Sequence, residues 1–162
     1  MSTGQGVLRN YFMEALDEVF ELASSEQLGS VDAIAGTVRN LLERVLASLA
    51  ESKTLCTVNV GVLGVSNTVE RIGGLERRNE YYTLFVACKV GDYFVKARMH
   101  VTIPFIHDVA RGRRYYGRIE LDSLEDMAIE RWSNEHLKWL SREPDEEYKK
   151  LVRERRALMT SS

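Results

Sequence analysis

The chain has 162 residues, of which 44% are hydrophobic and 28% are charged, and its formal net charge at pH 7 is −2. These values exclude wholesale disorder and a fibrous class, and a chain of this length buries roughly 70% of its unfolded surface, enough for one domain with a sizeable core. The charge is uneven, because residues 54–118 carry 10 lysines and arginines against 5 aspartates and glutamates.

Residues 4–52 show apolar side chains at the three- and four-residue spacing that is typical of amphipathic helices. The first stripe begins at Leu8, the second ends at Leu49, and Gly29 interrupts the pattern between them. Because Ser30 is suited to cap a helix after this short break, the segment predicts an antiparallel helical hairpin. No basic stripe lines the polar sides, so we expect the apolar stripes to pack against a sheet rather than a membrane.

After the helices the apolar period changes to two, which predicts an antiparallel sheet over residues 54–121. The first strand continues as a charged ribbon to a turn at Gly73-Gly74. Pairing around this turn places Val62 on the wrong face, and one inserted residue corrects the error. We therefore expect a bulge at Gly64.

The two cysteines, Cys56 and Cys88, fall on the same face of adjacent predicted strands, without a CxxC motif. No run of the sequence reaches the roughly 18 apolar residues of a membrane span, and the N-terminus lacks a secretory-signal pattern. We therefore expect a cytoplasmic protein with no membrane partner. In that compartment two reduced core thiols are predicted in preference to a disulfide.

The centre of the predicted sheet is a β-hairpin over residues 80–103 that turns at Gly91-Asp92. The turn fixes a register whose first face is apolar: Val90 with Tyr93, Cys88 with Val95, Val86 with Ala97, Leu84 with Met99 and Tyr82 with Val101. The second face mixes cations with aromatic rings: Lys89 with Phe94, Ala87 with Lys96, Phe85 with Arg98, Thr83 with His100 and Tyr81 with Thr102. A one-residue slip would exchange the two faces, so the pattern and the turn support the same register.

A turn at Arg111-Gly112 and renewed alternation from Arg114 to Leu121 predict a fourth strand. Asp122-Ser123 then has the form of a helix start, and apolar residues follow it at helical spacing. A last helix is predicted to begin at Pro144. The chain therefore predicts one α+β domain over residues 1–162.

This domain has three predicted parts: an N-terminal αα-hairpin (4–52), a four-stranded, mostly antiparallel meander sheet (54–121) and two C-terminal helices (123–159). Strands that follow each other in the chain usually pair, so the expected strand order is the chain order.

The strongest candidate surface is the second face of the hairpin together with the arginine-rich turns beside it. Unpaired bases stack on exposed aromatic rings while lysine and arginine neutralise phosphates. The candidate polyanion-binding residues are Arg71, Arg77, Arg78, Phe85, Phe94, Lys96, Arg98, Arg111, Arg113 and Arg114. The competing interpretation is that helices or a second subunit cover Phe85 and Phe94, because a sheet has two faces and four helices are predicted.

Catalytic signatures are absent from the sequence, which contains no GxSxG, HExxH, P-loop or GxGxxG motif. His107-Asp108 lies beside Arg111, but no nucleophile can be paired with it. The histidines and cysteines lack metal-ligand spacing. We therefore expect no catalytic residue, no cofactor and no metal site.

These features predict a non-enzymatic binding or assembly protein. We expect a homodimer that presents a basic, arginine-rich sheet face to a polyanion, such as a single-stranded nucleic acid, or to an acidic protein. The alternative is a small-molecule-binding or enzymatic domain with a pocket between sheet and helices, near Tyr82, His107 or Tyr115.

Overall fold

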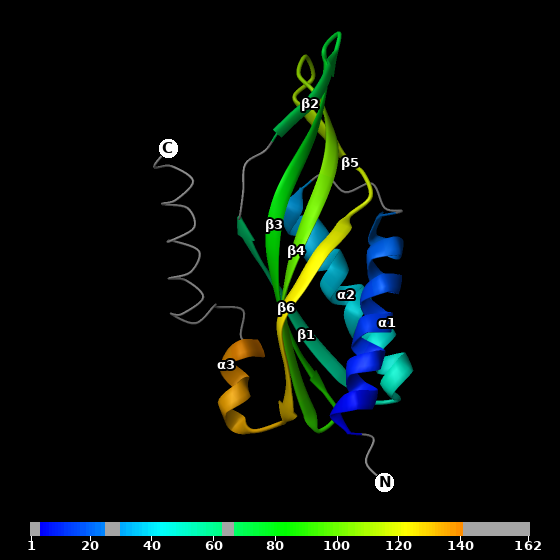
Figure 1. Cartoon of the computed structure of the whole chain (residues 1–162), viewed down its shortest axis with the longest axis vertical. Coiled ribbons are helices and arrows are strands. Elements are labelled where there is room, and N and C mark those ends of the chain that lie inside the picture. The colour runs from blue at the N-terminus through cyan, green and yellow to red at the C-terminus, as the bar shows by residue number, and fades with distance from the viewer. Residues whose placement is uncertain (1–3, 25–29, 63–66, 141–162) are drawn as a thin grey trace.

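The structure, a computed structural model of the chain, describes residues 4–24, 30–62 and 67–140 (Figure 1). Within these residues two helices are followed by six strands and a short C-terminal helical segment. The predicted α+β class, with a helical hairpin ahead of an antiparallel sheet, is confirmed. The helix predicted from Pro144 and the bulge predicted at Gly64 lie outside the described residues.

The helical hairpin consists of α1 (Gln5–Ser24) and α2 (Val31–Ala50), which lie on the same side of the sheet (Figure 1). Ser30 caps α2 as predicted, because its side-chain oxygen accepts a hydrogen bond from the Ala33 N–H at 3.1 Å. The apolar stripes of both helices are buried in one core with the sheet. Their buried residues are Leu8, Phe12, Ala15, Leu16, Val19, Phe20 and Ala23 in α1, and Ile34, Ala35, Val38, Leu42 and Leu46 in α2.

All six described strands belong to one antiparallel sheet. They are β1 (Thr54–Val62), β2 (Asn67–Ile72), β3 (Leu75–Val90), β4 (Tyr93–Asp108), β5 (Arg113–Tyr116) and β6 (Glu120–Arg131). β3 and β4 form the centre, β1 and β2 both pair with β3, and β5 and β6 both pair with β4. The predicted meander in chain order is therefore confirmed, with each outer position divided between two strands.

β3 and β4 confirm the predicted hairpin register, in which Val90 lies opposite Tyr93. Gly91 in the turn has a φ of 57°, which a residue without a Cβ adopts without strain. The pairing continues past the predicted segment to Leu75 opposite Asp108, so each strand is 16 residues long. We call the side that packs on α1 and α2 the helix face of the sheet, and the opposite side the far face.

The outer strands β1 and β2 meet β3 in two different registers. Ile72 of β2 lies opposite Leu75 of β3. Uninterrupted pairing from this point would place Val62 of β1 opposite Phe85. Val62 instead lies opposite Tyr82, so the offset is three residues rather than the predicted one. A bulge inside β2 supplies one of the three. Any odd offset keeps the apolar residues of β1 on the helix face, because side chains alternate with a period of two.

The predicted helix from Asp122 is wrong, because residues 120–131 form strand β6. The register between β6 and β4 shifts twice, and each shift inserts one extra residue into β6. An extra residue lengthens the two-residue repeat of a strand to three residues, which imitates helical spacing. The residues that show this spacing and pack on the core are Leu121, Leu124 and Met127.

The second bulge of β6 contains Asp126, whose φ of 54° is incompatible with a right-handed helix. Helical structure after β6 is limited, within the described residues, to the 3₁₀ turn η1 (Asn134–His136) and the four-residue α3 (Leu137–Leu140). A long C-terminal helix therefore does not start where the sequence predicts it.

The sheet extends past the helical layer as an arm at the top of Figure 1. We define this distal arm as residues 67–80 and 103–118, which include β2, β5 and the adjoining ends of β3 and β4. Its two turns lie side by side, because the Val109 N–H donates a hydrogen bond to the Gly74 carbonyl at 3.0 Å. The far end of the arm has no helix over either face within the described residues (Figure 1).

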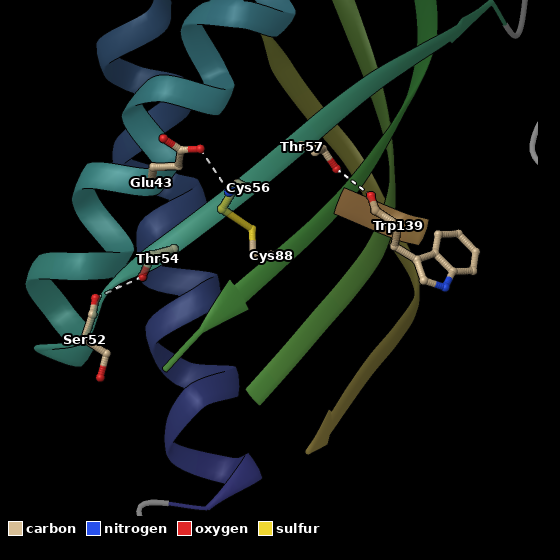
Figure 2. Close-up of a disulfide and its surroundings, with 7 residues drawn as sticks. All are labelled: Glu43, Ser52, Thr54, Cys56, Thr57, Cys88 and Trp139. Atoms are coloured by element: carbon tan, nitrogen blue, oxygen red, sulfur yellow. Dashed lines mark hydrogen bonds between the residues drawn. A yellow bond between two sulfur atoms is a disulfide. The ribbon is translucent and has the colours of Figure 1, made fainter. Parts of the chain in front are cut away.

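Cys56 and Cys88 lie directly opposite each other in β1 and β3, with Cα atoms 4.1 Å apart, and form a disulfide (Figure 2). The predicted pair of reduced thiols is therefore wrong. Both cysteines are buried on the helix face. The outward N–H of Cys56 donates a hydrogen bond to the Glu43 carboxylate of α2 at 3.0 Å, which covers this edge of the sheet.

Candidate functional site

Phe94, one of the predicted stacking residues, is buried, with 1% of its surface exposed. Its ring stacks on that of His136 with centroids 4.2 Å apart, and the Trp132 ring packs at 6.2 Å. Both covering residues come after the end of β6 in the chain and lie on the far face, opposite α1 and α2. Phe94 is therefore unavailable for stacking on a base, as the competing interpretation of this face predicts.

Lys96 and Phe85 also make contacts within the chain. The Lys96 ammonium lies 4.6 Å from the ring centroid of Trp139. The Thr57 hydroxyl donates a hydrogen bond to the Trp139 carbonyl at 3.0 Å, which fixes α3 against β1 (Figure 2). Phe85 is half-buried and pairs with Arg98 across the strands. Residues 132–139 therefore contact Phe94 and Lys96, two residues of the predicted stacking platform.

Arg98 belongs to an ion-pair network between β4 and β6. Its guanidinium contacts the carboxylates of Glu125, at 3.2 Å, and Asp126. The Glu125 carboxylate also accepts a hydrogen bond from Nε2 of His100 at 3.1 Å. The His100 hydrogen bond, and then the nearby Arg98 charge, hold the pKa of Glu125 below its ordinary value. Arg98 is therefore neutralised by its own sheet.

Thr83, His100 and Glu125 form a line of hydroxyl, imidazole and carboxylate, which is the order found in nucleophile relays. The Thr83 hydroxyl lies 3.1 Å from Nδ1 of His100, whose Nε2 lies 3.1 Å from Glu125. Thr83 is fully buried, so a substrate could not reach its Oγ1. The line therefore ties β3, β4 and β6 together rather than forming a catalytic centre.

The remaining six predicted site residues, Arg71, Arg77, Arg78, Arg111, Arg113 and Arg114, all lie on the distal arm. The arm carries seven arginines and no lysine, against four carboxylates. Five arginines form ion pairs at 3.0 to 3.8 Å: Arg71 and Arg78 with Glu76, Arg77 with Glu70, Arg111 with Asp108, and Arg114 with Glu80. The structure thus gathers arginines from two separate turns and neutralises part of their charge.

Glu80 is the buried centre of a brace that crosses the helix face of the arm. Its carboxylate accepts hydrogen bonds from Arg114 of β5, at 3.0 Å, and from the Tyr82 hydroxyl. The Arg114 guanidinium also lies 5.0 Å from the ring of buried Phe105, on which Tyr116 packs at 5.4 Å. The brace therefore links β3 to β5 across β4.

Two groups of this brace have shifted pKa values. Burial, followed by the hydrogen bond to Glu80, raises the pKa of the Tyr82 hydroxyl. The hydrogen bond with Tyr116 raises the pKa of Arg114. Both shifts favour the protonated forms of Tyr82 and Arg114, which donate to the Glu80 carboxylate.

The far face of the arm carries a stripe of exposed apolar side chains that the sequence does not predict. We call it the arm stripe; it consists of Ile72, Leu75, Ile106 and Tyr115, whose exposed fractions are 66%, 45%, 43% and 45%. Ile72 lies opposite Leu75, and Ile106 lies opposite Tyr115. Leu75 and Ile106 are diagonal neighbours, because Leu75 lies opposite Asp108. The stripe therefore crosses all four strands of the arm.

The sequence holds one clue to the arm stripe. Extending the register of the Gly91 turn along both strands would have placed Leu75 beside Ile106 on the cation-bearing face. The predicted hairpin ends at residue 103, before this pair is reached. Pro104 lacks a backbone N–H, yet it pairs with Asn79 of β3, and its carbonyl accepts a hydrogen bond from the Gly117 N–H at 2.7 Å.

No family model, curated protein or solved structure matches this chain. Among the described residues no group of three or more histidine, cysteine, aspartate or glutamate side chains could hold a metal ion. None of the described helices has the length and apolar character needed to cross a membrane. A functional proposal for this chain therefore rests on the geometry of its described residues.

The three residues named for a pocket do not converge. Tyr82 lies on the helix face and donates its hydroxyl to Glu80. Tyr115 lies on the far face of the arm, opposite Ile106. His107 pairs with Glu76 on the helix face, several positions farther out than Tyr82. The arrangement therefore does not place these groups around one substrate.

Proposed function

We propose that the protein is a non-enzymatic binding protein whose distal arm docks on an acidic protein partner. The observation that supports this proposal is the arm stripe, an exposed apolar surface set among arginines. Protein interfaces are enriched in arginine and aromatic residues and depleted in lysine, as this arm is. Hydrogen bonds to buried Glu80 link two strands of the arm, which limits the conformational entropy that is lost on docking.

A protein partner fits this surface better than a nucleic acid. Nucleic acids are bound through many phosphate contacts, whereas the arm has a net charge of only +3, from seven arginines and four carboxylates. The predicted base-stacking ring of Phe94 is covered by His136 and Trp132. Four exposed apolar side chains in a row instead favour a partner that buries apolar surface of its own. A polyanion is accordingly the second candidate.

Site-specific photo-crosslinking in source cells tests the proposal. A crosslinking amino acid at Tyr115 should give one discrete adduct that protease removes and nuclease does not. The matched control is Leu55, which is exposed to a similar extent on the far face of β1, outside the arm, and should give none. Ile106→Asp should abolish the Tyr115 adduct. A nuclease-sensitive adduct would establish the polyanion, and equal adducts from both positions would contradict arm docking.

The homodimer and the cytoplasmic location stay predictions. Symmetric dimers are the commonest assembly of soluble chains, and exposed aliphatic side chains on the far face are compatible with one. A dimer would leave the arm proposal intact only if the arm stripe stays outside the interface between copies.

A further inference from the structure

We propose that the docked segment of the partner is an amphipathic helix with acidic flanks, which lies along the arm stripe and across the four strands. This inference rests on the proposed function and specifies the shape and charge of what the arm binds. It follows from the direction of the stripe, from the edges of the arm and from the position of the arginines.

The direction of the arm stripe suits a helix. Its four residues occupy β2, β3, β4 and β5 in turn, so the stripe runs across the strands over three inter-strand spacings, or about 14 Å. A helix rises 1.5 Å per residue, so about ten residues cover this length and present apolar side chains at i, i+3 or i+4 and i+7. An extended strand would instead align with the edges of the sheet, along β2 or β5.

The edges of the arm are poorly suited to adding a strand. β2 has six residues and contains a bulge, and β5 has four residues, two of which are arginines. Short length, bulges and charged side chains are the features that prevent pairing at sheet edges. The open apolar surface of the arm is therefore its face rather than its edges.

Arginines lie on both sides of the arm stripe. Arg77 lies on the side nearer the helices and is paired with Glu70 at 3.6 Å, both side chains being about half exposed. Arg113 lies opposite Asp108 on the side nearer the turns, beside the exposed Arg111. Exposed ion pairs contribute little free energy, so a partner carboxylate can replace Glu70 at small cost, and the Arg111 side chain is itself largely exposed beside Asp108. Acidic residues on both flanks of a bound helix would thus meet arginines, which bind carboxylates in a bidentate manner.

The described helices of a second copy do not meet these requirements. The apolar stripes of α1 and α2 are buried in their own core. The solvent side of α1 carries Glu14, Asp17, Glu18 and Glu21, and its exposed apolar residues are too widely spaced along the helix to form a row; they are Val7, Met13 and Leu22. An acidic amphipathic helix of another protein is therefore the occupant that the arm fits.

Fluorescence anisotropy with the full chain and labelled peptides tests this inference. The probe is an 18-residue peptide with leucines at i, i+3, i+4 and i+7 positions, flanked by glutamates. It should bind at least about tenfold more tightly than a scrambled peptide of the same composition or one with a central proline. Ile106→Asp should weaken binding by about tenfold or more and Arg113→Glu by about fivefold, whereas Leu55→Asp should have no effect.

The outcomes separate this inference from the proposed function. If the proline peptide binds as well as the helical one, or if no peptide binds while the Tyr115 crosslink persists, the helical partner is wrong and arm docking stands. If a 20-nucleotide single strand displaces the peptide at equal concentration, the acidic helix is likewise refuted. If no peptide binds and Tyr115 gives no crosslink, both the helical partner and the proposed function are refuted. The substituted side chains are exposed, so each variant should keep the native fold. Circular dichroism checks this.

Discussion

At the scale of single residues, Glu80 links β3 to β5 within the distal arm. It is a buried carboxylate, 8% exposed, whose two partners come from different strands. A buried carboxylate without partners is strongly unfavourable, so the hydrogen bonds from Arg114 and Tyr82 are required by its position. The arm keeps its shape because the three groups satisfy one another.

Replacing Glu80 should therefore destabilise the protein. Glu80→Ala leaves the Tyr82 hydroxyl and the Arg114 guanidinium without their acceptor and should lower the free energy of unfolding by about 1–3 kcal/mol. The control Glu70→Ala removes an ion pair that is about half exposed on both sides and should change it by no more than about 0.5 kcal/mol. Urea unfolding of both variants measures the difference. Equal effects would mean that Glu80 does not brace the arm.

The raised pKa of Tyr82 predicts a loss of stability at alkaline pH. The folded-state pKa lies above the unfolded value, so the neutral hydroxyl contributes stability that is fully present below pH about 10 and is lost as the pH rises through the folded-state pKa. Urea unfolding from pH 8 to 11.5 should show a decline for the native chain that is smaller in Tyr82→Phe. Tyr115→Phe, which removes an exposed tyrosine, should decline as the native chain does. Identical slopes in all three proteins would refute the assignment.

At the scale of elements, strand β6 shows where a pattern of apolar residues misleads. Its bulges lengthen the repeat to three residues, and Asp122-Ser123 resembles a helix start. Tertiary pairing decides the outcome, because β4 extends past β5 and its exposed edge needs a partner. The β3–β4 hairpin could be predicted since the Gly91 turn and the alternation agree, whereas bulges depend on neighbours that a single sequence does not reveal.

The disulfide between β1 and β3 should contribute substantially to stability. The two cysteines are 32 residues apart in the sequence, and closing a loop of this size in the unfolded chain is worth about 3–4 kcal/mol. Urea unfolding with and without a reductant should show a loss of this size in the native chain. The double variant Cys56→Ala/Cys88→Ala should be insensitive to the reductant. An unchanged midpoint after thiol assay confirms reduction would contradict the prediction.

At the scale of the whole molecule, the class, the strand order and the central register could be predicted from sequence. The arrangement of the candidate site could not. Phe94 and Arg98 were predicted to form one open surface with the arginines of the turns. The residues that cover Phe94 and pair with Arg98 lie more than 25 positions later in the chain. The arm stripe likewise depends on Leu75 and Ile106 meeting across a long hairpin. Such long-range neighbours follow from tertiary packing, which local periodicity does not encode.

The predicted homodimer can be tested on the whole molecule by sedimentation equilibrium at tens of micromolar. A dimer would have twice the chain mass of 18.5 kDa. Ile106→Asp should leave this mass unchanged if the arm is reserved for another protein, and should halve it if the arm stripe joins the two copies. A mass of one chain in the native protein would refute the homodimer.

The disulfide between Cys56 and Cys88 closes a covalent ring that encloses one turn of the distal arm but not the other. The Gly73-Gly74 turn lies inside the ring that the bond closes, whereas residues 109–112 lie outside it. Arginines flank both turns, so trypsin can nick either one. A nick in the first turn leaves both fragments joined on a non-reducing denaturing gel, while a nick in the second releases a free C-terminal fragment. The band pattern before and after reduction therefore reports which of the two adjacent turns opens first.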